Sequence, residues 1–254
     1  KLEFLLADSL AQGCDTLITT GAVQSNHCRQ TAAAAAQAGL ACHLVLGGQP
    51  PTGPNGNLLL DLLLGAELHW TSRENRLNRL NALRDALIAG DRRPYFITYG
   101  GSNPVGATGY AAALEETLAQ AREQGVTFDA IVFASSSGGT QAGLVAGAWA
   151  LGCDWPVLGI SIDESEGALR EKVAALATET AQRIGHPRSF AAADIPVDAG
   201  YLGGGYGVVG ELEREAVRVM AQTEGILLDP VYTGRAFGGL LDIVRRAPER
   251  LARQ

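Results

Sequence analysis

Lysine is almost missing from this sequence. The chain has 254 residues and 20 basic side chains, but its only lysines are Lys1 and Lys172, and every other basic residue is arginine. Arginine stays protonated in proteins, whereas a lysine amine can lose its proton and react. Any chemistry that needs a lysine amine therefore has two candidates in this chain.

Paired cysteines are missing too. The four cysteines, Cys14, Cys28, Cys42 and Cys153, form no CxxC motif. Their scatter argues against a metal site and is typical of buried thiols in a reducing compartment. We therefore predict a cytoplasmic protein without a bound metal.

The sequence also lacks long apolar runs and an excess of positive charge. No apolar run approaches the length of a membrane span, and residues 1–13 lack the basic head, apolar core and cleavage site of a secretion signal. The net charge is −7, which argues against nucleic acid and anionic membranes as partners. Hydrophobic residues make up 46% of the chain and charged residues 19%, as in ordinary globular proteins.

Short apolar runs alternate along the chain with helical patterns. Strands are predicted at 16–20, 41–46, 67–70, 95–98, 130–134 and 157–162, and helices at 2–12, 26–39, 58–64, 77–88, 111–124, from 140, at 165–184, 209–223 and 235–246. Strand and helix in turn, with short glycine-rich connections, predict an α/β fold of open, twisted, mostly parallel sheets.

The densest break in the first half is the segment 100–109, GGSNPVGATG. It predicts a domain crossing, with a small α/β domain at 1–107 and a larger one at 108–254. Both ends of the sequence look cut. The chain opens on Lys1 inside a helical pattern and closes on PERLARQ without a final strand.

The sharpest local signal is the segment 135–140, SSSGGT, between a buried strand and a helix. Glycine lets the backbone turn so that successive N–H groups face one anion, and the hydroxyls and the helix N-terminus add donors and positive potential. A serine that only caps the helix is the plainer explanation. Three serines and two glycines exceed what a cap needs, so we predict a phosphate-binding turn at Ser136, Ser137, Gly138, Gly139 and Thr140.

Two common nucleotide motifs do not fit this turn. A dinucleotide fingerprint needs G-x-G-x-x-G, and Thr140 stands where the second glycine belongs, although Asp163 ends the next strand as that motif requires. A P-loop needs Gly-Lys-Ser/Thr, which does not occur. A phosphate of mononucleotide size remains.

A second polar turn, 21–27 (GAVQSNH), also joins a strand to a helix. Its side chains and the helix N-terminus suit a carboxylate, and the Ser25 hydroxyl could carry a proton. Equally, Ser25 or Asn26 is only an N-cap and His27 a surface residue. Taken alone, the pattern leaves both interpretations open.

Two tyrosines stand in the third polar region. Tyr206 lies in the glycine-rich loop 201–207, and Tyr232 lies in DPVYTG before the last predicted helix. Two phenols in a cleft can donate to a substrate and move protons. An isolated tyrosine more often only packs, with its hydroxyl in water.

Five segments together resemble a known family. KLEFLLADSLAQG, TLITTGAVQSNHCRQTAAAAA, SSSGGTQAG, GGGYG and LLDPVYTGRA, in this order, are similar to D-cysteine desulfhydrase and 1-aminocyclopropane-1-carboxylate deaminase. The resemblance covers essentially the whole chain. It implies the tryptophan synthase β-like fold (fold type II), pyridoxal 5'-phosphate held between two domains, a small amino-acid substrate, and a homodimer.

The resemblance also implies roles for single residues. Ser136 to Thr140 would hold the cofactor phosphate, Asn26 would meet the ring hydroxyl, and Lys1 and Thr233 would also contact the cofactor. Gln24 and Ser25 would face the substrate carboxylate and α-carbon, with Ser25 moving a proton. Tyr206 and Tyr232 would line the substrate side as catalytic residues.

The sequence departs from the family at the lysine. The family's Gly-Asn-Lys stretch, whose lysine binds the cofactor covalently, precedes Arg-Lys-Leu-Glu, and Lys1 matches the later lysine, a phosphate contact. Lys172 stands in a charged helical pattern and is expected to be a solvated surface residue. The family's C-terminal strand, which reaches the pyridine nitrogen, is also absent. We therefore expect this chain to be truncated at both ends and inactive alone.

The resemblance leaves the reaction open among relatives. D-cysteine desulfhydrase, which converts D-cysteine to pyruvate, ammonia and sulfide, is favoured because family deaminases carry glutamate after the tyrosine of DPVY, where this sequence has Thr233. 1-Aminocyclopropane-1-carboxylate deaminase and L-cysteate sulfo-lyase remain alternatives. From another class, the chain could be a non-catalytic binder of a phosphate ligand.

Overall fold

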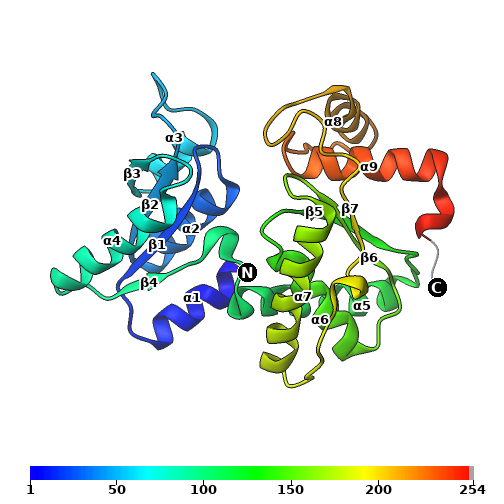
Figure 1. Ribbon diagram of the computed structural model, residues 1–254, viewed down its shortest axis with the longest axis horizontal. Coiled ribbons are helices and arrows are strands. Elements are labelled where there is room, and N and C mark those ends of the chain that lie inside the picture. Colours follow the sequence, from blue (N-terminus) through cyan, green and yellow to red (C-terminus); the bar gives the residue numbers. More distant parts are fainter. Residues whose placement is uncertain (252–254) are drawn as a thin grey trace. The chain divides into compact units, whose positions relative to one another are not determined.

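The computed structural model describes residues 1–251 and divides into two compact units, Lys1–Gly109 and Tyr110–Gln254, the second described as far as residue 251. Each unit has a parallel sheet with helices packed on it. In Figure 1 the first unit runs from blue to green and the second from green to red. The predicted α/β class with parallel sheets is confirmed.

The first unit is built on four parallel strands in the order β3-β2-β1-β4. The strands are β1 (Thr16–Ala22), β2 (Ala41–Gly47), β3 (Glu67–Thr71) and β4 (Pro94–Phe96). The helices are α1 (Leu2–Ala11), α2 (Asn26–Ala38), α3 (Gly56–Leu63) and α4 (Arg76–Ala89), followed by the short 3₁₀ turn Tyr99–Gly101.

Both faces of this sheet are covered because successive side chains of a strand point to opposite faces. Leu17 of β1 packs in one core cluster with residues of α1, α2 and α3, whereas the next residue, Ile18, packs in another with Leu80 and Leu83 of α4. A strand that is buried on both faces has a continuous run of apolar residues in its sequence. Residues 16–20 and 41–46 could therefore be predicted as strands.

The second unit has three parallel strands in the order β5-β6-β7. The strands are β5 (Ile131–Ser135), β6 (Val157–Ser161) and β7 (Val197–Asp198). The helices are α5 (Pro104–Gln124, which begins in the first unit), α6 (Gly139–Leu151), α7 (Glu166–Arg183), α8 (Glu211–Glu224) and α9 (Thr233–Arg246), with 3₁₀ turns at Ala192–Asp194 and Pro248–Leu251. Leu158 and Ile160 pack with Ala236 and Ile243 of α9, while a Cβ on Gly159 would meet Gln141 of α6.

The predicted start of the helix that follows the segment 100–109 was wrong. Helix α5 begins at Pro104, seven residues before the predicted start at 111. Proline is well suited to the first turn of a helix, and the Asn103 side chain accepts a hydrogen bond from the Gly106 N–H (2.8 Å). A Cβ on Gly106 would lie 2.2 Å from the Gly101 carbonyl oxygen, so this glycine serves close packing.

Strand β7 was not predicted. It has two residues and pairs with β6 at Gly159 and Ile160. Two residues are too few to show the alternation of apolar and polar side chains by which a strand is predicted. Between residues 1 and 251, no helix is both long and apolar enough to cross a membrane.

Candidate functional site

The turn after β1 carries the first group of predicted residues. Ser25 is the N-cap of α2, and its Oγ accepts a hydrogen bond from the Cys28 N–H (3.1 Å). Ser25 is 7% exposed. A Cβ on Gly21 would lie 2.7 Å from the Ser25 Oγ, so glycine at this position lets the hydroxyl pack against the end of β1. The capping role is therefore confirmed, and the predicted proton transfer stays a prediction.

Gln24 and Asn26 are tied to the turn that begins α3. The Gln24 side-chain amide donates to Asn55 Oδ1 (2.9 Å), and its oxygen accepts from the Asn57 N–H (2.9 Å). The Asn57 side-chain amide donates to Asn26 Oδ1 (2.8 Å) and to the Gln24 carbonyl (2.9 Å). These bonds use the amide oxygen of Asn26 and leave its NH₂ group oriented as a donor, as a ring hydroxyl or carboxylate oxygen requires.

His27 is not the surface residue that the plainer interpretation expected. Its Nε2 lies 2.9 Å from Thr19 Oγ1, and the same Thr19 hydroxyl donates to the Ile97 carbonyl (3.0 Å). Since the hydroxyl has one proton and donates it to Ile97, His27 Nε2 must be the protonated nitrogen. Burial, helped by the charge of Lys1, lowers the pKa of His27 to about 3, so the ring is neutral and holds the turn in place.

Lys1 lies in the same unit and is partly buried. Its Nζ donates to the Gly100 carbonyl (2.9 Å), and burial lowers its pKa from 10.5 to about 8. Near pH 8 about half of these amines are therefore neutral. Lys172 differs, because its Nζ forms an ion pair with Glu164 and its side chain is 40% exposed, as expected for a surface residue.

The predicted phosphate turn connects β5 to α6 in the second unit. Gly138 is the N-cap of α6 and has a left-handed backbone (φ 85°, ψ −19°). A Cβ there would lie 3.2 Å from Val173 Cγ2. The following helix has 13 residues and begins at Gly139, so its N-terminal N–H groups and positive end are directed at this turn. Glycine at 138 is thus required by the backbone as well as by the space.

Two serines of this turn behave differently. The Ser135 hydroxyl is buried and, among residues 1–251, has no hydrogen-bond partner. A buried hydroxyl without a partner costs free energy that a bound oxygen would recover. The Ser136 hydroxyl donates instead to Asp163, whose pKa is raised by burial despite this bond. The Ser136 hydroxyl is therefore engaged with Asp163, and its predicted contact with the cofactor phosphate stays a prediction.

The two predicted tyrosines meet. Tyr206 Oη and Tyr232 Oη are 2.8 Å apart, with the rings edge to face at 6.1 Å between centroids. Tyr206 belongs to the glycine-rich loop and Tyr232 is the N-cap of α9, so the fold brings together phenols that are 26 positions apart. A hydrogen-bonded phenol pair can pass a proton from one oxygen to the other.

Asp229 holds Tyr232 in place. Its carboxylate accepts hydrogen bonds from the backbone N–H groups of Val231 (3.0 Å), Tyr232 (2.7 Å) and Thr233 (3.0 Å), and from the Thr233 hydroxyl (2.8 Å). A carboxylate at a helix N-terminus is stabilised by the helix dipole. The Thr233 hydroxyl is therefore engaged in this cap, and its predicted contact with the cofactor stays a prediction.

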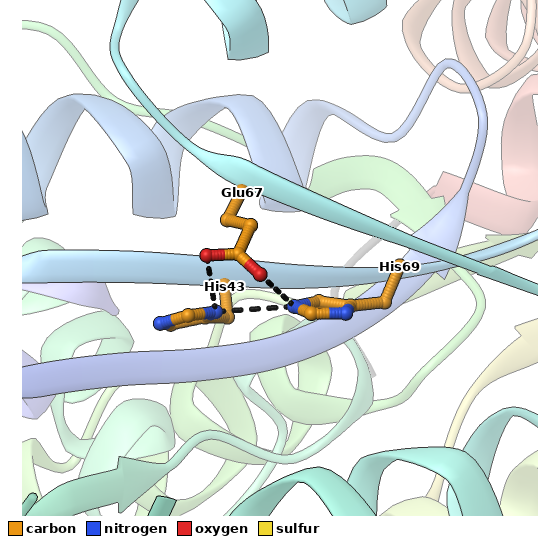
Figure 2. A group of neighbouring side chains, drawn as sticks. All are labelled: His43, Glu67 and His69. Carbon is orange, nitrogen blue, oxygen red and sulfur yellow. Dashed lines mark hydrogen bonds and ion pairs between the residues drawn. The ribbon is translucent and has the colours of Figure 1, made fainter.

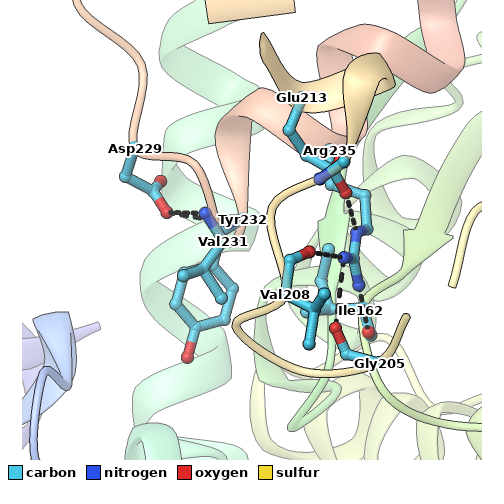
Figure 3. A network of polar contacts seen from close by, with 9 residues as sticks. Ile162, Gly205, Val208, Glu213, Asp229, Val231, Tyr232 and Arg235 are labelled. Carbon is cyan, nitrogen blue, oxygen red and sulfur yellow. Dashed lines mark hydrogen bonds and ion pairs between the residues drawn. The ribbon is translucent and has the colours of Figure 1, made fainter. Parts of the chain in front are cut away.

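Arg235 of α9 fixes the glycine-rich loop. The residue is 1% exposed and pairs with buried Glu213 (Nε to Oε1 2.7 Å). Its guanidinium also donates to the carbonyls of Ile162 (2.9 Å), Gly205 (3.2 Å) and Val208 (2.9 Å). Figure 3 shows the guanidinium at the centre of these partners, with Tyr232 and Asp229 on the neighbouring turn. Arg235 thus ties the end of β6 to the loop around Tyr206.

Within each unit, the predicted residues gather around polar turns. The first unit brings together Gln24, Ser25, Asn26 and His27. The second unit brings Tyr206 to Tyr232, beside Thr233, and separately forms the turn 135–140.

Comparison with known proteins identifies the family. Residues 1–251 match a family described as pyridoxal-phosphate dependent enzyme. The chain belongs to this family. The resemblance, the fold type and the pyridoxal phosphate predicted from the sequence are confirmed.

Relatives in this family include D-cysteine desulfhydrase of Klebsiella pneumoniae strain 342, which is 44% identical over 248 residues, covering 95% of this chain and 74% of that protein. A protein of Pyrococcus abyssi called putative 1-aminocyclopropane-1-carboxylate deaminase is 37% identical over 255 residues, covering 97% of this chain and 74% of that protein.

Solved structures include proteins with a similar fold. A homologue of 1-aminocyclopropane-1-carboxylate deaminase has a TM-score of 0.86 and 37% identity, covering 96% of this chain and 74% of that one. A threonine deaminase from T.th. has a TM-score of 0.68 at 20% identity, covering 97% of this chain and 77% of that one, and supports the fold alone.

Sequence reasoning missed several residues that support the site. Asn55 and Asn57 fix Gln24 and Asn26, and the polar run PNGN was their only local signal. Asp229 and Arg235 stand inside a segment recognised as similar to the family, but their roles depend on partners that the sequence does not show.

The phosphate turn can be tested by a matched pair of glycine substitutions. Gly138→Ala should weaken binding of pyridoxal phosphate by at least about tenfold, a loss of about 1.4 kcal/mol, because the left-handed residue and the neighbouring N–H groups must shift. Gly152→Ala is the control, since Gly152 ends the same helix with φ 63° and has open space around it. Equilibrium titration of both variants measures the difference, and equal affinities would contradict the phosphate turn.

Proposed function

We propose that this protein catalyses the pyridoxal-phosphate-dependent α,β-elimination of a small amino acid, with D-cysteine as the preferred substrate. D-cysteine and one water would yield pyruvate, ammonia and hydrogen sulfide. The bound cofactor supplies an electron sink for the electron pair left at the α-carbon. The side chains of this chain bind and orient the substrate and move its protons.

The observation that carries this proposal is the phenol pair Tyr206–Tyr232, 2.8 Å from oxygen to oxygen. Elimination requires a proton donor for the leaving sulfur, and a phenol backed by a second phenol can donate and be reprotonated. The pair is held by the Asp229 cap on one side and the loop bound by Arg235 on the other. Preorganised donors of this kind cost little reorganisation during the reaction.

Thr233 supports elimination over ring opening. Its hydroxyl is bound into the Asp229 cap and carries no charge, so this position cannot supply the negative charge that the glutamate of family deaminases would. The Klebsiella relative at 44% identity, named D-cysteine desulfhydrase, agrees with this choice.

The same proposal gives binding and proton-transfer roles to three residues of the first unit. The Ser25 hydroxyl would move the proton at the α-carbon, and Gln24 and the Asn26 NH₂ group would orient the substrate carboxylate and the cofactor hydroxyl. Ser25 is 7% exposed and held in a fixed position by its cap, which suits a proton carrier. The Gln24 amide is engaged with Asn55 and Asn57, so its backbone N–H is the group we assign to the carboxylate.

We further propose that residues 136–140 hold the cofactor phosphate, aided by Lys1, and that this chain alone binds the cofactor without covalent capture and without turnover. Lys172 is paired with Glu164, which supports excluding it. Borohydride reduction of the chain mixed with cofactor, followed by peptide mass spectrometry, tests this. Stoichiometric labelling of Lys172 with substrate turnover would overturn it. Tight cofactor binding with no activity from the complete reading frame would favour the non-catalytic binder.

Deamination of 1-aminocyclopropane-1-carboxylate is the second candidate, favoured by the Pyrococcus relative and by the solved homologue at 37% identity. A substrate panel on the product of the complete reading frame distinguishes the candidates. We expect sulfide and pyruvate from D-cysteine, and little product from L-cysteate or aminocyclopropane-carboxylate. Robust deamination of aminocyclopropane-carboxylate with no sulfide from D-cysteine would reverse the order.

Removing one hydroxyl of the Tyr206–Tyr232 pair tests whether the pair donates a proton in the reaction. In the protein assayed with the substrate panel, Tyr232→Phe is expected to lower kcat/KM for D-cysteine by about 10²-fold, the usual value of a lost proton donor, while pyridoxal phosphate binding is retained. Tyr201→Phe is the control, because Tyr201 donates to Asp242 (3.1 Å) in the same unit, outside the phenol pair. A loss of activity of the same size in both variants would argue against a catalytic pair.

A further inference from the structure

Two neighbouring strands of the first unit place three potential metal ligands together. His43 of β2 pairs in register with Glu67 of β3, and His69 follows two residues after Glu67. Side chains two apart on a strand share a face, so all three lie on one side of the sheet. Figure 2 shows the Glu67 carboxylate reaching toward both imidazoles, with one ring nitrogen of each histidine facing the other.

The distances among the ligand atoms match those of a coordination site. His43 Nδ1 and His69 Nε2 are 3.1 Å apart, and the Glu67 oxygens lie 3.5 Å from the first and 3.4 Å from the second. Ligands at about 2.0–2.2 Å from a tetrahedral zinc ion stand about 3.4 Å from one another. The Glu67 distances involve different oxygens, Oε2 for His43 and Oε1 for His69, so each pair of potential ligands already stands at about the spacing of neighbouring zinc ligands.

The surroundings suit three ligands with one open position. The histidine side chains are each 13% exposed and the glutamate 65%, so the rings are held while the carboxylate side faces solvent.

We propose that His43, Glu67 and His69 form a binding site for a divalent transition-metal ion, with Zn²⁺ the ion that this ligand set fits best and water the fourth ligand. Two imidazoles and one carboxylate favour zinc over the harder Mg²⁺ and Ca²⁺, which prefer all-oxygen sites. Neither histidine has to lose a net proton. The N–H between the two rings moves to an outer nitrogen when the ion takes its place.

Charges near the site work in both directions. Arg92 carries a positive charge near His43, and Arg79 carries one near His69. The same arginines oppose a dication, whereas the Glu67 carboxylate attracts it. The site should therefore be of moderate affinity, and without metal the three residues form a hydrogen-bonded cluster.

Binding would join the outermost strand to its neighbour. β3 is the edge of the sheet and pairs only with β2 among the described strands. An ion ligated from both strands adds a bond between them that does not depend on backbone pairing. The sequence prediction of no metal was based on cysteine spacing and did not consider His43 and His69, which are 26 positions apart.

The test uses the 254-residue chain, stripped with chelator and free of cofactor, because pyridoxal phosphate itself binds metals. Calorimetric titration with ZnCl₂ should give one site per chain and raise the melting temperature. His43→Ala and His69→Ala should each weaken the affinity at least about tenfold, since losing even an outer-shell partner costs about 10–100-fold. Glu67→Gln should weaken it while leaving the fold intact, because Glu67 is 65% exposed.

His186→Ala is the matched control, because His186 is exposed in the second unit. Titration with CoCl₂ adds a spectroscopic check: nitrogen and oxygen ligands give weak visible bands without the strong near-ultraviolet band of a cysteine thiolate. A thiolate band, an affinity unchanged in both histidine variants, or an equal loss in His186→Ala would each overturn the proposal.

Discussion

Replacing Arg235 with alanine is expected to lower the free energy of unfolding of the second unit by about 3–5 kcal/mol. The guanidinium is 1% exposed and its partner Glu213 is buried with it. Burial alone would raise the pKa of Glu213, but the hydrogen bonds from Arg235 and the Gly210 N–H lower it overall. Removing the arginine therefore leaves a carboxylate buried without its countercharge.

The same substitution leaves carbonyl groups of Ile162, Gly205 and Val208 without their donor. The loop around Tyr206 should lose its fixed position, and lyase activity should fall even where the variant still folds. Arg235→Lys should recover part of the stability, because an ammonium restores the charge but cannot reach all four partners.

Urea denaturation followed by tryptophan fluorescence measures this loss. A Trp70→Phe background leaves Trp149 and Trp155 as reporters in the second unit. Arg245→Ala is the control, since Arg245 lies in the same helix, is 55% exposed and pairs with Glu215 at the surface. It should change stability by less than about 0.5–1 kcal/mol. Equal effects at both positions would show that Arg235 holds no buried network.

Replacing Asp61 with asparagine is expected to stabilise the first unit at pH 7 by about 1–3 kcal/mol. Asp61 of α3 has no exposed surface, and neither carboxylate oxygen has a hydrogen-bond partner among residues 1–251. Burial raises its pKa from 3.8 to about 6, against the opposing charge of Arg29. At pH 7 the folded chain therefore carries a buried, unsolvated charge.

The sign of the pH dependence follows from proton binding. Between about pH 4 and pH 6 the folded state keeps the Asp61 proton and the unfolded state releases it, so the contribution of Asp61 to stability falls as the pH rises. The advantage of Asp61→Asn should thus be largest above pH 6 and shrink toward pH 4. An asparagine amide also leaves unsatisfied polar groups, but its cost does not change with pH. The pH dependence of the stability difference between Asp61→Asn and wild type therefore reports the buried carboxylate.

Denaturation curves from pH 4.5 to pH 8 measure how the stability difference between wild type and Asp61→Asn changes with pH. Asp85→Asn is the control. Asp85 is 66% exposed and pairs with Arg84 on α4 of the same unit, so its removal should give a small difference with little pH dependence in this range. A pH-independent difference for Asp61→Asn would mean that the pKa of Asp61 is the same in the folded and unfolded states.

Most of the strands and helices followed from local patterns. The β-branched run 16–20, the alanine-rich helix at 26–38 and the serine and glycine turn at 135–140 each carry their signal in consecutive residues. The sequence-based prediction failed at two elements, because the local residue pattern was misleading for one and too short for the other. Helix α5 begins among glycines whose role is close packing, and β7 has two residues.

The sequence by itself therefore determined the α/β class, the family and its cofactor, and the turns that carry Ser25, Gly138 and Tyr206. Tertiary structure alone decided which side chains meet. His43 and His69 face each other because β2 and β3 pair in one register, and Arg235 reaches a carbonyl 73 positions away. Helix and strand periods report one element at a time, whereas a buried charge or a ligand set depends on how separate elements pack, and that information is spread over the whole core.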